Sequence, residues 1–260
     1  MARSNFYYHA KRYKSGDKYE EVRKAISGFY HKHKGRMGYR RITLLLKGQG
    51  YTINHKTVYR LMQLMKLKSL IRGKKYRSYR GEEGKIAPNV LNRMFKSAKP
   101  NQKWVTDITE FNIGGRKLYL SPILDLYNQE IVSYELSEHP SLKSVTKMLE
   151  QAFEKQLQLE SLILHSDQGW QYQMRKYQKA LEDKGIVQSM SRKGNCLDNA
   201  VMENFFGTLK TELFYLKKYK SIEELKKEIK GYITYYNHDR IKLNLNGMSP
   251  VQYRAHHIKN

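Results

Sequence analysis

The sequence predicts an α/β core with a mixed sheet, preceded by a small all-α domain. From residue 103 onward, three successive strand-like segments are followed by helices and strands in alternation, the order typical of an α/β domain. The charge also differs along the chain: positions 1–100 carry 26 basic and 5 acidic residues, and the remaining 160 carry 23 and 19. We therefore expect a basic helical region over 1–68, a basic linker over 69–102 and a core over 103–260.

Helical periodicity organises the front region. Hydrophobic residues recur at helical spacing between residues 18 and 32. A second, short helix is predicted over 35–47, ending at a pair of glycines. A third is predicted from about 55 to 66, after Asn54, whose side chain suits a helix N-cap. The second and third helices form a helix-turn-helix candidate, although a plain helical hairpin has the same pattern.

Three candidate DNA contacts lie in the first two turns of the predicted third helix. In a helix-turn-helix motif, the second helix of the motif enters the major groove of DNA with its first turns facing the bases. His55, Lys56 and Arg60 are therefore expected near DNA. The formal net charge of +25 supports this, because a dense positive field attracts polyanions. A solvating face would explain the charge without DNA, but such faces rarely carry so one-sided a count.

The composition of residues 69–102 is that of a linker. Residues 74–81 mix cations with tyrosines, and Pro88 and Pro100 interrupt regular structure. Basic side chains there can hold a phosphate backbone while tyrosines stack on exposed bases. A solvated flexible tether fits the same composition.

Composition also bears on the class of protein. Hydrophobic residues make up 40% of the 260 residues, which is enough for a packed core. No apolar run reaches the roughly 18 residues that a membrane span needs. The one cysteine, Cys196, allows no internal disulfide, which fits a reducing compartment. We therefore expect a cytoplasmic protein.

The core region alternates between strand-like and helical patterns after its first three strands. A glycine pair at 114–115 predicts a hairpin turn, and Ser221 followed by Glu224 predicts a helix cap. Strands are predicted over 104–111, 117–126, 130–136, 161–165 and 186–188. Helices are predicted over 142–157, 176–183, 200–215 and 222–236.

Three carboxylates lie in settings that favour metal chemistry. Asp107 lies inside an apolar strand, where an unpaired charge is costly. Asp167 follows the fourth predicted strand, and Glu203 lies early in a helix. Mg²⁺ prefers carboxylate oxygens together with water and phosphate. Composition alone does not select these three from the nineteen acids of the back region, and any one of them could be an ordinary surface or capping carboxylate, as Asp198 is expected to be for the helix after it.

Resemblance to a known family selects them. Thirty-five residues separate Asp167 from Glu203, which is the spacing characteristic of the bacterial insertion-sequence transposases of the downstream-frame type, whose catalytic core resembles that of retroviral integrases. The order of several motifs strengthens the resemblance, which covers about residues 20–255. The motifs that carry it are residues 38–42, 104–109, 165–172, 198–212, 236–241 and 248–253.

This resemblance implies a ribonuclease-H-like core in which Asp107, Asp167 and Glu203 are both catalytic residues and metal ligands, holding two Mg²⁺ or Mn²⁺ ions. Lys210 shares the helix face of Glu203, seven residues on, and the resemblance implies that it contacts DNA; an exposed helix lysine is the alternative. Arg40 and Arg41, in the front motif, are implied DNA contacts as well. His165 and Asn199 are weaker candidates for support of the metal site.

The implied reaction is metal-dependent cleavage of DNA at the element ends, followed by strand transfer into target DNA. Two other functions fit the same basic front: a DNA-binding regulator without catalysis, and a nuclease that hydrolyses without joining. Implied partners are double-stranded DNA, further copies of the chain on that DNA, and an upstream-frame partner or fusion. The front lacks the two cysteines of the retroviral zinc module.

Overall fold

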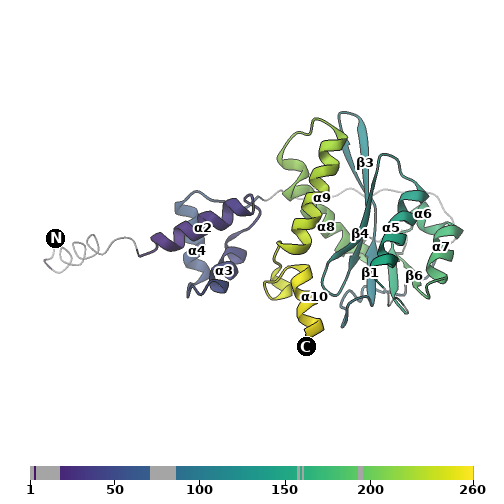
Figure 1. The fold of residues 1–260 in the computed structure, drawn as a ribbon, viewed down its shortest axis with the longest axis horizontal. Coiled ribbons are helices and arrows are strands. Elements are labelled where there is room, and N and C mark those ends of the chain that lie inside the picture. Colours follow the sequence, from purple (N-terminus) through teal and green to yellow (C-terminus); the bar gives the residue numbers. More distant parts are fainter. Residues whose placement is uncertain are drawn as a thin grey trace. The chain divides into compact units, whose positions relative to one another are not determined.

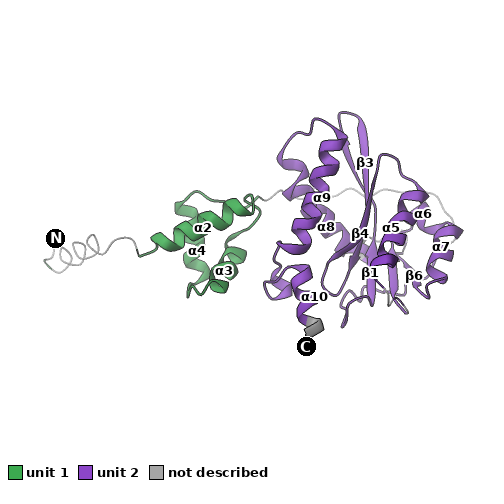
Figure 2. Cartoon of the chain, viewed as in Figure 1, with its two compact units in different colours: residues 1–71 green, residues 72–260 purple. Residues whose placement is uncertain are grey.

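The structure is a computed structural model that describes residues 18–70, 86–156, 159, 161–192 and 196–259, together with residue 3. Figure 1 shows the fold, and Figure 2 shows the two compact units into which the chain divides, residues 1–71 and residues 72–260.

Three helices form the described part of the first unit (Figure 1). They are α2 (Glu20–Lys32), α3 (Tyr39–Gly48) and α4 (His55–Leu64). Each helix contributes to a small apolar core, in which Ile26, Met37, Ile42, Leu46 and Val58 are completely buried. The amphipathic spacing seen in the sequence is therefore what packs these helices together.

Single residues next to these helices determine where the helices begin. The side chain of Asn54 accepts a hydrogen bond from the backbone N–H of Lys56 at 2.8 Å, as predicted for an N-cap. The second helix begins at Tyr39, four residues later than expected. Gly35 has a φ of +72°, a left-handed conformation that favours glycine and does not continue a helix.

One mixed sheet forms the centre of the second unit. Its strands are β1 (Lys103–Thr106), β2 (Thr109–Ile113), β3 (Arg116–Asp125), β4 (Ile131–Ser137), β5 (Ile163–Ser166) and β6 (Val187–Met190). The strand order is β2-β3-β1-β5-β6, with β4 paired to β3. The pairs β1–β5 and β5–β6 are parallel, and the others are antiparallel. The predicted mixed sheet is confirmed.

The predicted strand 104–111 was wrong in one respect: it is divided into β1 and β2. Both halves pair with β3 in a single antiparallel register, which continues across the gap and sets Asp107 opposite Pro122. Proline has no N–H to donate to a sheet ladder. The hydroxyl of Thr106 donates to the Pro122 carbonyl at 2.9 Å, so the strand opens at Asp107.

Helices cover both faces of this sheet. On one side lie α8 (Ala200–Glu212) and α9 (Ile222–His238), and on the other lie α5 (Leu142–Lys155), α6 (Trp170–Gln173) and α7 (Arg175–Glu182) (Figure 1). A further helix, α10 (Pro250–Lys259), contacts α9. None of the helices within the described residues is long and apolar enough to cross a membrane.

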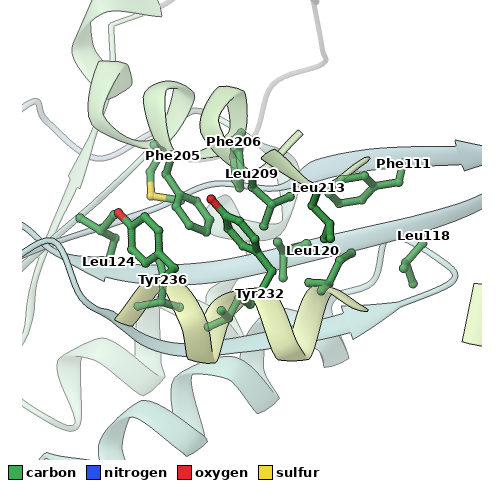
Figure 3. Packing of buried hydrophobic residues seen from close by; sticks show 14 of the residues in the cluster. Phe111, Leu118, Leu120, Leu124, Phe205, Phe206, Leu209, Leu213, Tyr232 and Tyr236 are labelled. Carbon is green, nitrogen blue, oxygen red and sulfur yellow. The ribbon is translucent and has the colours of Figure 1, made fainter. Parts of the chain in front are cut away.

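Two apolar clusters fill the space between the sheet and these layers. Figure 3 shows the first, where Phe205 and Leu209 of α8 and Tyr236 of α9 pack on Leu120 and Leu124 of β3. The second joins the opposite face to α5 and α7. Because side chains alternate across a strand, Val105 enters the first cluster and its neighbour Trp104 enters the second.

The expected linker over 69–102 lies partly outside the described residues. Residues 69–70 and 86–102 of it are described, and the second of these segments packs on the core: Leu91 is completely buried within the first cluster. At the other predicted cap, the Ser221 hydroxyl accepts from the Glu224 backbone N–H at 3.1 Å. The Glu224 carboxylate accepts from the Lys220 N–H rather than closing the box on Ser221.

Candidate active site

Asp107 lies in the gap between β1 and β2 and is half-buried. Its Oδ1 accepts a hydrogen bond from the backbone N–H of Ile108 at 2.7 Å. Burial holds the pKa of Asp107 well above its usual value, and the negative charges of Asp167 and Glu203 raise it further. The Ile108 hydrogen bond and the charge of Lys210 act in the opposite direction. The charges of both other predicted carboxylates therefore act on the carboxyl group of Asp107.

Asp167 follows the last residue of β5 and is also half-buried. β1 and β5 are parallel neighbours, paired so that Val105 lies beside His165. Two residues further on, this register brings Asp107 beside Asp167 at the same end of the sheet. Burial raises the pKa of Asp167, while the N–H of Gly169, which donates to its Oδ1 at 2.9 Å, lowers it.

Glu203 lies in the first turn of α8, and its side chain is exposed. The start of this helix is attached to the end of β1, because the amide of Asn199 donates to the carbonyl of Thr106 at 3.2 Å. Thr106 immediately precedes Asp107. The helix therefore begins at the end of the sheet where Asp107 and Asp167 lie.

The three acids do not form a closed ligand cage. Across the described ranges, no three His, Cys, Asp or Glu side chains are gathered in a way that would hold a metal ion. The structure instead brings together two neighbouring aspartates, with Glu203 near enough for its charge to act on Asp107.

Lys210 is half-buried rather than an exposed helix lysine. Its Nζ lies 5.3 Å from the ring centroid of Phe111 on β2. Burial lowers the pKa of Lys210, whereas the charges of Glu110 and Asp107 raise it. The ammonium group thus lies over the Phe111 ring on β2, near enough to Asp107 for the two charges to interact.

His165 and Asp198 are two buried polar residues close to these acids. Burial lowers the pKa of His165 to about 4, so its ring is neutral at pH 7. Asp198, expected as a helix cap, instead accepts hydrogen bonds from Arg93 and Arg192. Arg192 is the main cause of an Asp198 pKa well below its usual range. Sequence reasoning missed the ion pair between Asp198 and Arg93, because these two residues lie far apart along the chain.

The predicted DNA contacts of the first unit differ in exposure. Arg40, His55, Lys56 and Arg60 are exposed. His55 stacks on Tyr39 with ring centroids 6.2 Å apart. Arg41 is only partly exposed, and its guanidinium donates to the backbone carbonyl of Arg36 at 3.4 Å.

Models of known protein families match both the helical first unit and the sheet-containing second unit. Residues 97–196 and 203–258 match models of the integrase core domain, and residues 18–75 match the model of an HTH-like domain. The predicted integrase-type, ribonuclease-H-like core after a helix-turn-helix region is thus confirmed.

Two relatives are similar along most of their length. The chain is 59% identical over 254 residues to the putative transposase InsK for insertion sequence element IS150 of Escherichia coli (strain K12), covering 98% of this chain and 90% of that protein. It is 37% identical over 239 residues to the transposase for insertion sequence element IS904 of Lactococcus lactis subsp. lactis (strain IL1403), covering 91% and 94%. The chain therefore belongs to the insertion-sequence transposases, and its function is DNA transposition.

Proposed function

We propose that this transposase cleaves and joins DNA at the ends of its insertion element with Asp107, Asp167 and Glu203 as catalytic carboxylates. One observation supports this most strongly: Asp107 and Asp167 follow the ends of two neighbouring parallel strands, and the charges of Asp167 and Glu203 both act on Asp107. A carboxylate whose pKa is raised by burial and by neighbouring carboxylates, as that of Asp107 is, is typical of functional sites.

The same three residues are the proposed metal ligands. Their donor atoms are all carboxylate oxygens, which suit Mg²⁺ or Mn²⁺. The pKa of Asp107 is raised first by burial and then by the charges of Asp167 and Glu203, and a bound cation would favour its charged form. Two such ions, when bound, would activate an attacking oxygen and stabilise a leaving one. Because Glu203 is exposed at the start of α8, it is the ligand that would move most on binding.

The proposed chemistry has two displacements at phosphorus. In the first, a water molecule loses a proton and its oxygen bonds to the phosphorus at the element end, the bond from phosphorus to the 3′ oxygen breaks, and that oxygen takes a proton and leaves as a hydroxyl. In the second, this hydroxyl loses its proton and bonds to a target phosphorus, whose own 3′ oxygen leaves and is protonated. Neither displacement requires a covalent bond between enzyme and DNA, so the residues act by holding the reactants in line.

Lys210 is proposed to hold the phosphate backbone of the element end. An ammonium group is a compact point charge that suits phosphate. The Lys210 ammonium lies over the ring of Phe111 on β2, and the charges of Glu110 and Asp107 favour its charged form there, beside the proposed centre.

The first unit is proposed to bind double-stranded DNA through Arg40, His55, Lys56 and Arg60, which are exposed on α3 and α4. Arg41 is a weaker contact, because its guanidinium is engaged with the Arg36 carbonyl. Assembly of several copies on DNA, and cooperation with an upstream-frame product, belong to the same proposal.

The test is incubation of the purified protein with labelled element-end DNA and Mn²⁺. The unaltered chain should release 3′ ends and join them to other DNA. Asp107→Asn, Asp167→Asn and Glu203→Gln should each abolish both products and leave DNA binding largely intact. Cleavage without joining would indicate a nuclease, and metal-dependent activity in any of the three variants would remove that residue from the proposed site.

A further inference from the structure

Residues 86–95, which we call the strap, run along the edge of the sheet before the first strand. The backbone N–H of Met190, at the end of β6, donates to the carbonyl of Pro88 at 3.3 Å. Two and three residues further along the strap, the N–H groups of Val90 and Leu91 both donate to the hydroxyl of Ser189, each at 3.0 Å. The strap is thus attached to β6 by backbone as well as side-chain hydrogen bonds.

Ser189 carries this attachment toward Asp167. Its hydroxyl has two acceptor sites, both used by the strap, and one proton, which must therefore go to Nδ1 of His165 at 2.8 Å. Nε2 of His165 then carries the ring hydrogen and donates to the Ser191 hydroxyl at 3.1 Å. Ser191 in turn donates to the carbonyl of Ser166 at 3.2 Å. This chain of hydrogen bonds ends at the residue before Asp167.

Asp198 connects the strap to the start of α8, the helix that carries Glu203. This completely buried carboxylate accepts from Arg93 Nε at 2.7 Å and from the Asn89 amide at 3.0 Å, both in the strap. It also accepts from the backbone and guanidinium of Arg192. Asp198 is followed directly by Asn199, which binds the end of β1, and then by α8.

Apolar packing links the strap to the same helix. Leu91 is completely buried in one cluster with Met202 and Phe205, which flank the position of Glu203 on α8. Side chains on either side of Glu203 in the sequence therefore share a core with the strap, while Glu203 itself remains exposed.

We infer that the strap positions the active site: Arg93 and Asn89 act through Asp198 on the helix that carries Glu203, and Ser189 connects the strap to β5, the strand that Asp167 follows. Arg93 and Asp198 are thus positioning residues, and this role rests on the proposed function. Partners of metal-ligating groups tune metal affinity by holding the ligands in place, and their loss typically weakens it about 10- to 100-fold.

The test measures Mn²⁺ binding by the full chain without DNA, from the electron paramagnetic resonance of free Mn²⁺. Arg93→Ala should weaken Mn²⁺ binding about tenfold and lower strand joining. Arg93→Lys should recover part of both, because the charge remains and the fork of the guanidinium is lost. Asn89→Ala, a milder change, should shift both in the same direction.

Arg254→Ala is the matched control. Arg254 is also a guanidinium beside a completely buried aspartate, since its Nη1 lies 3.8 Å from Asp125 and 3.1 Å from Glu130. It belongs to α10 rather than to the strap. This variant should lose at least as much stability to urea as Arg93→Ala and keep the Mn²⁺ affinity of the unaltered chain.

The outcomes separate the two proposals. If Arg93→Ala and Asn89→Ala bind Mn²⁺ like the unaltered chain, or if Arg254→Ala weakens binding equally, the strap has only a structural role and the inference is overturned. Asp167→Asn must itself weaken Mn²⁺ binding. If it does not, or if the unaltered chain binds no Mn²⁺, the proposed function fails and the inference falls with it.

Discussion

At the scale of single residues, the geometry of the proposed site depends on the gap between β1 and β2, where Asp107 lies. Pro122 faces Asp107 across the sheet and has no N–H to offer it. The carbonyl of Pro122 is taken by the Thr106 hydroxyl. Asp107 is thereby released from regular pairing, and its carboxylate accepts from the next backbone N–H, that of Ile108.

Pro122→Ala tests this role of the proline. The new N–H faces the gap and can pair with the backbone of Asp107, so the ladder should close and the carboxylate should shift. We expect strand joining to fall about 10- to 100-fold, the scale of a small misplacement of reacting groups, with no loss of thermal stability. Strand joining on pre-cleaved ends and thermal unfolding are the measurements. Full joining activity would show that the gap does not depend on Pro122.

Lys210 separates positioning of DNA from binding of metal. Lys210→Ala should strongly lower joining of pre-cleaved ends and leave Mn²⁺ affinity nearly unchanged, because its ammonium group is proposed to hold phosphate. Lys210→Arg should keep part of the activity. Lys227→Ala, at an exposed lysine of α9, is the control and should join normally. Unaltered joining by Lys210→Ala would mean that Lys210 is an ordinary helix lysine.

Among the elements, α8 is fixed at both ends. Its start is tied to β1 through Asn199. At its end, the buried carboxylate of Glu212 accepts two-pronged hydrogen bonds from Arg240, which follows α9, and a third from the Tyr232 hydroxyl at 2.9 Å. A helix held at both ends keeps the backbone at Glu203 and Lys210 in a fixed relation to the sheet, while the exposed Glu203 side chain can still turn.

Arg240→Ala should therefore destabilise the protein by about 3–5 kcal/mol, because it leaves Glu212 as an uncompensated buried charge. Replacing both partners with apolar residues, in Glu212→Leu with Arg240→Met, should restore much of the loss. Urea unfolding of the full chain measures both. A cost below about 1 kcal/mol for Arg240→Ala, the range of a surface pair, would contradict this account of the pair.

The local pattern of hydrophobic and polar residues predicted most helices and strands. The features that it did not predict depend on residues that lie far apart in the sequence. The helix and strand periodicities placed α5, α7 and β4 within a few residues, since each buries one regular face. The gap at Asp107 depends on Pro122 across the sheet, and the partners of Asp198 include Arg93, far away in sequence. Neither interaction leaves a periodic signal. The acids of the site were selected by resemblance to a family, because their residue type alone is common.

At the scale of the whole molecule, most of the net positive charge lies in positions 1–100, whereas the proposed catalytic residues lie further along the chain. Positions 1–100 carry a net charge of +21 and the remainder +4. The exposed cations of the first unit include Lys56 and Arg60, near the start of α4. DNA affinity is therefore expected to depend mainly on the front, and chemistry on the second unit.

Binding of random-sequence DNA should weaken steeply with salt. Replacing both Lys56 and Arg60 by alanine should flatten the slope of log affinity against log salt concentration by about 2, because each of the two cations is expected to neutralise one phosphate. Lys227→Ala with Lys230→Ala, two exposed cations of α9, should leave the slope nearly unchanged. Fluorescence anisotropy across a salt series measures both pairs. The reverse ranking would assign the main DNA-binding surface to the second unit.

The central claim is that Asp107, Asp167 and Glu203 converge on divalent metal. A crystal structure of the protein with Mn²⁺, with the ions located by anomalous scattering, tests it most directly. Anomalous peaks should lie between the carboxylates of Asp107 and Asp167, with Glu203 turned toward them and all three groups within about 8 Å of one another. Ions bound elsewhere, or Glu203 directed away from both aspartates with the ions in place, would contradict the claim.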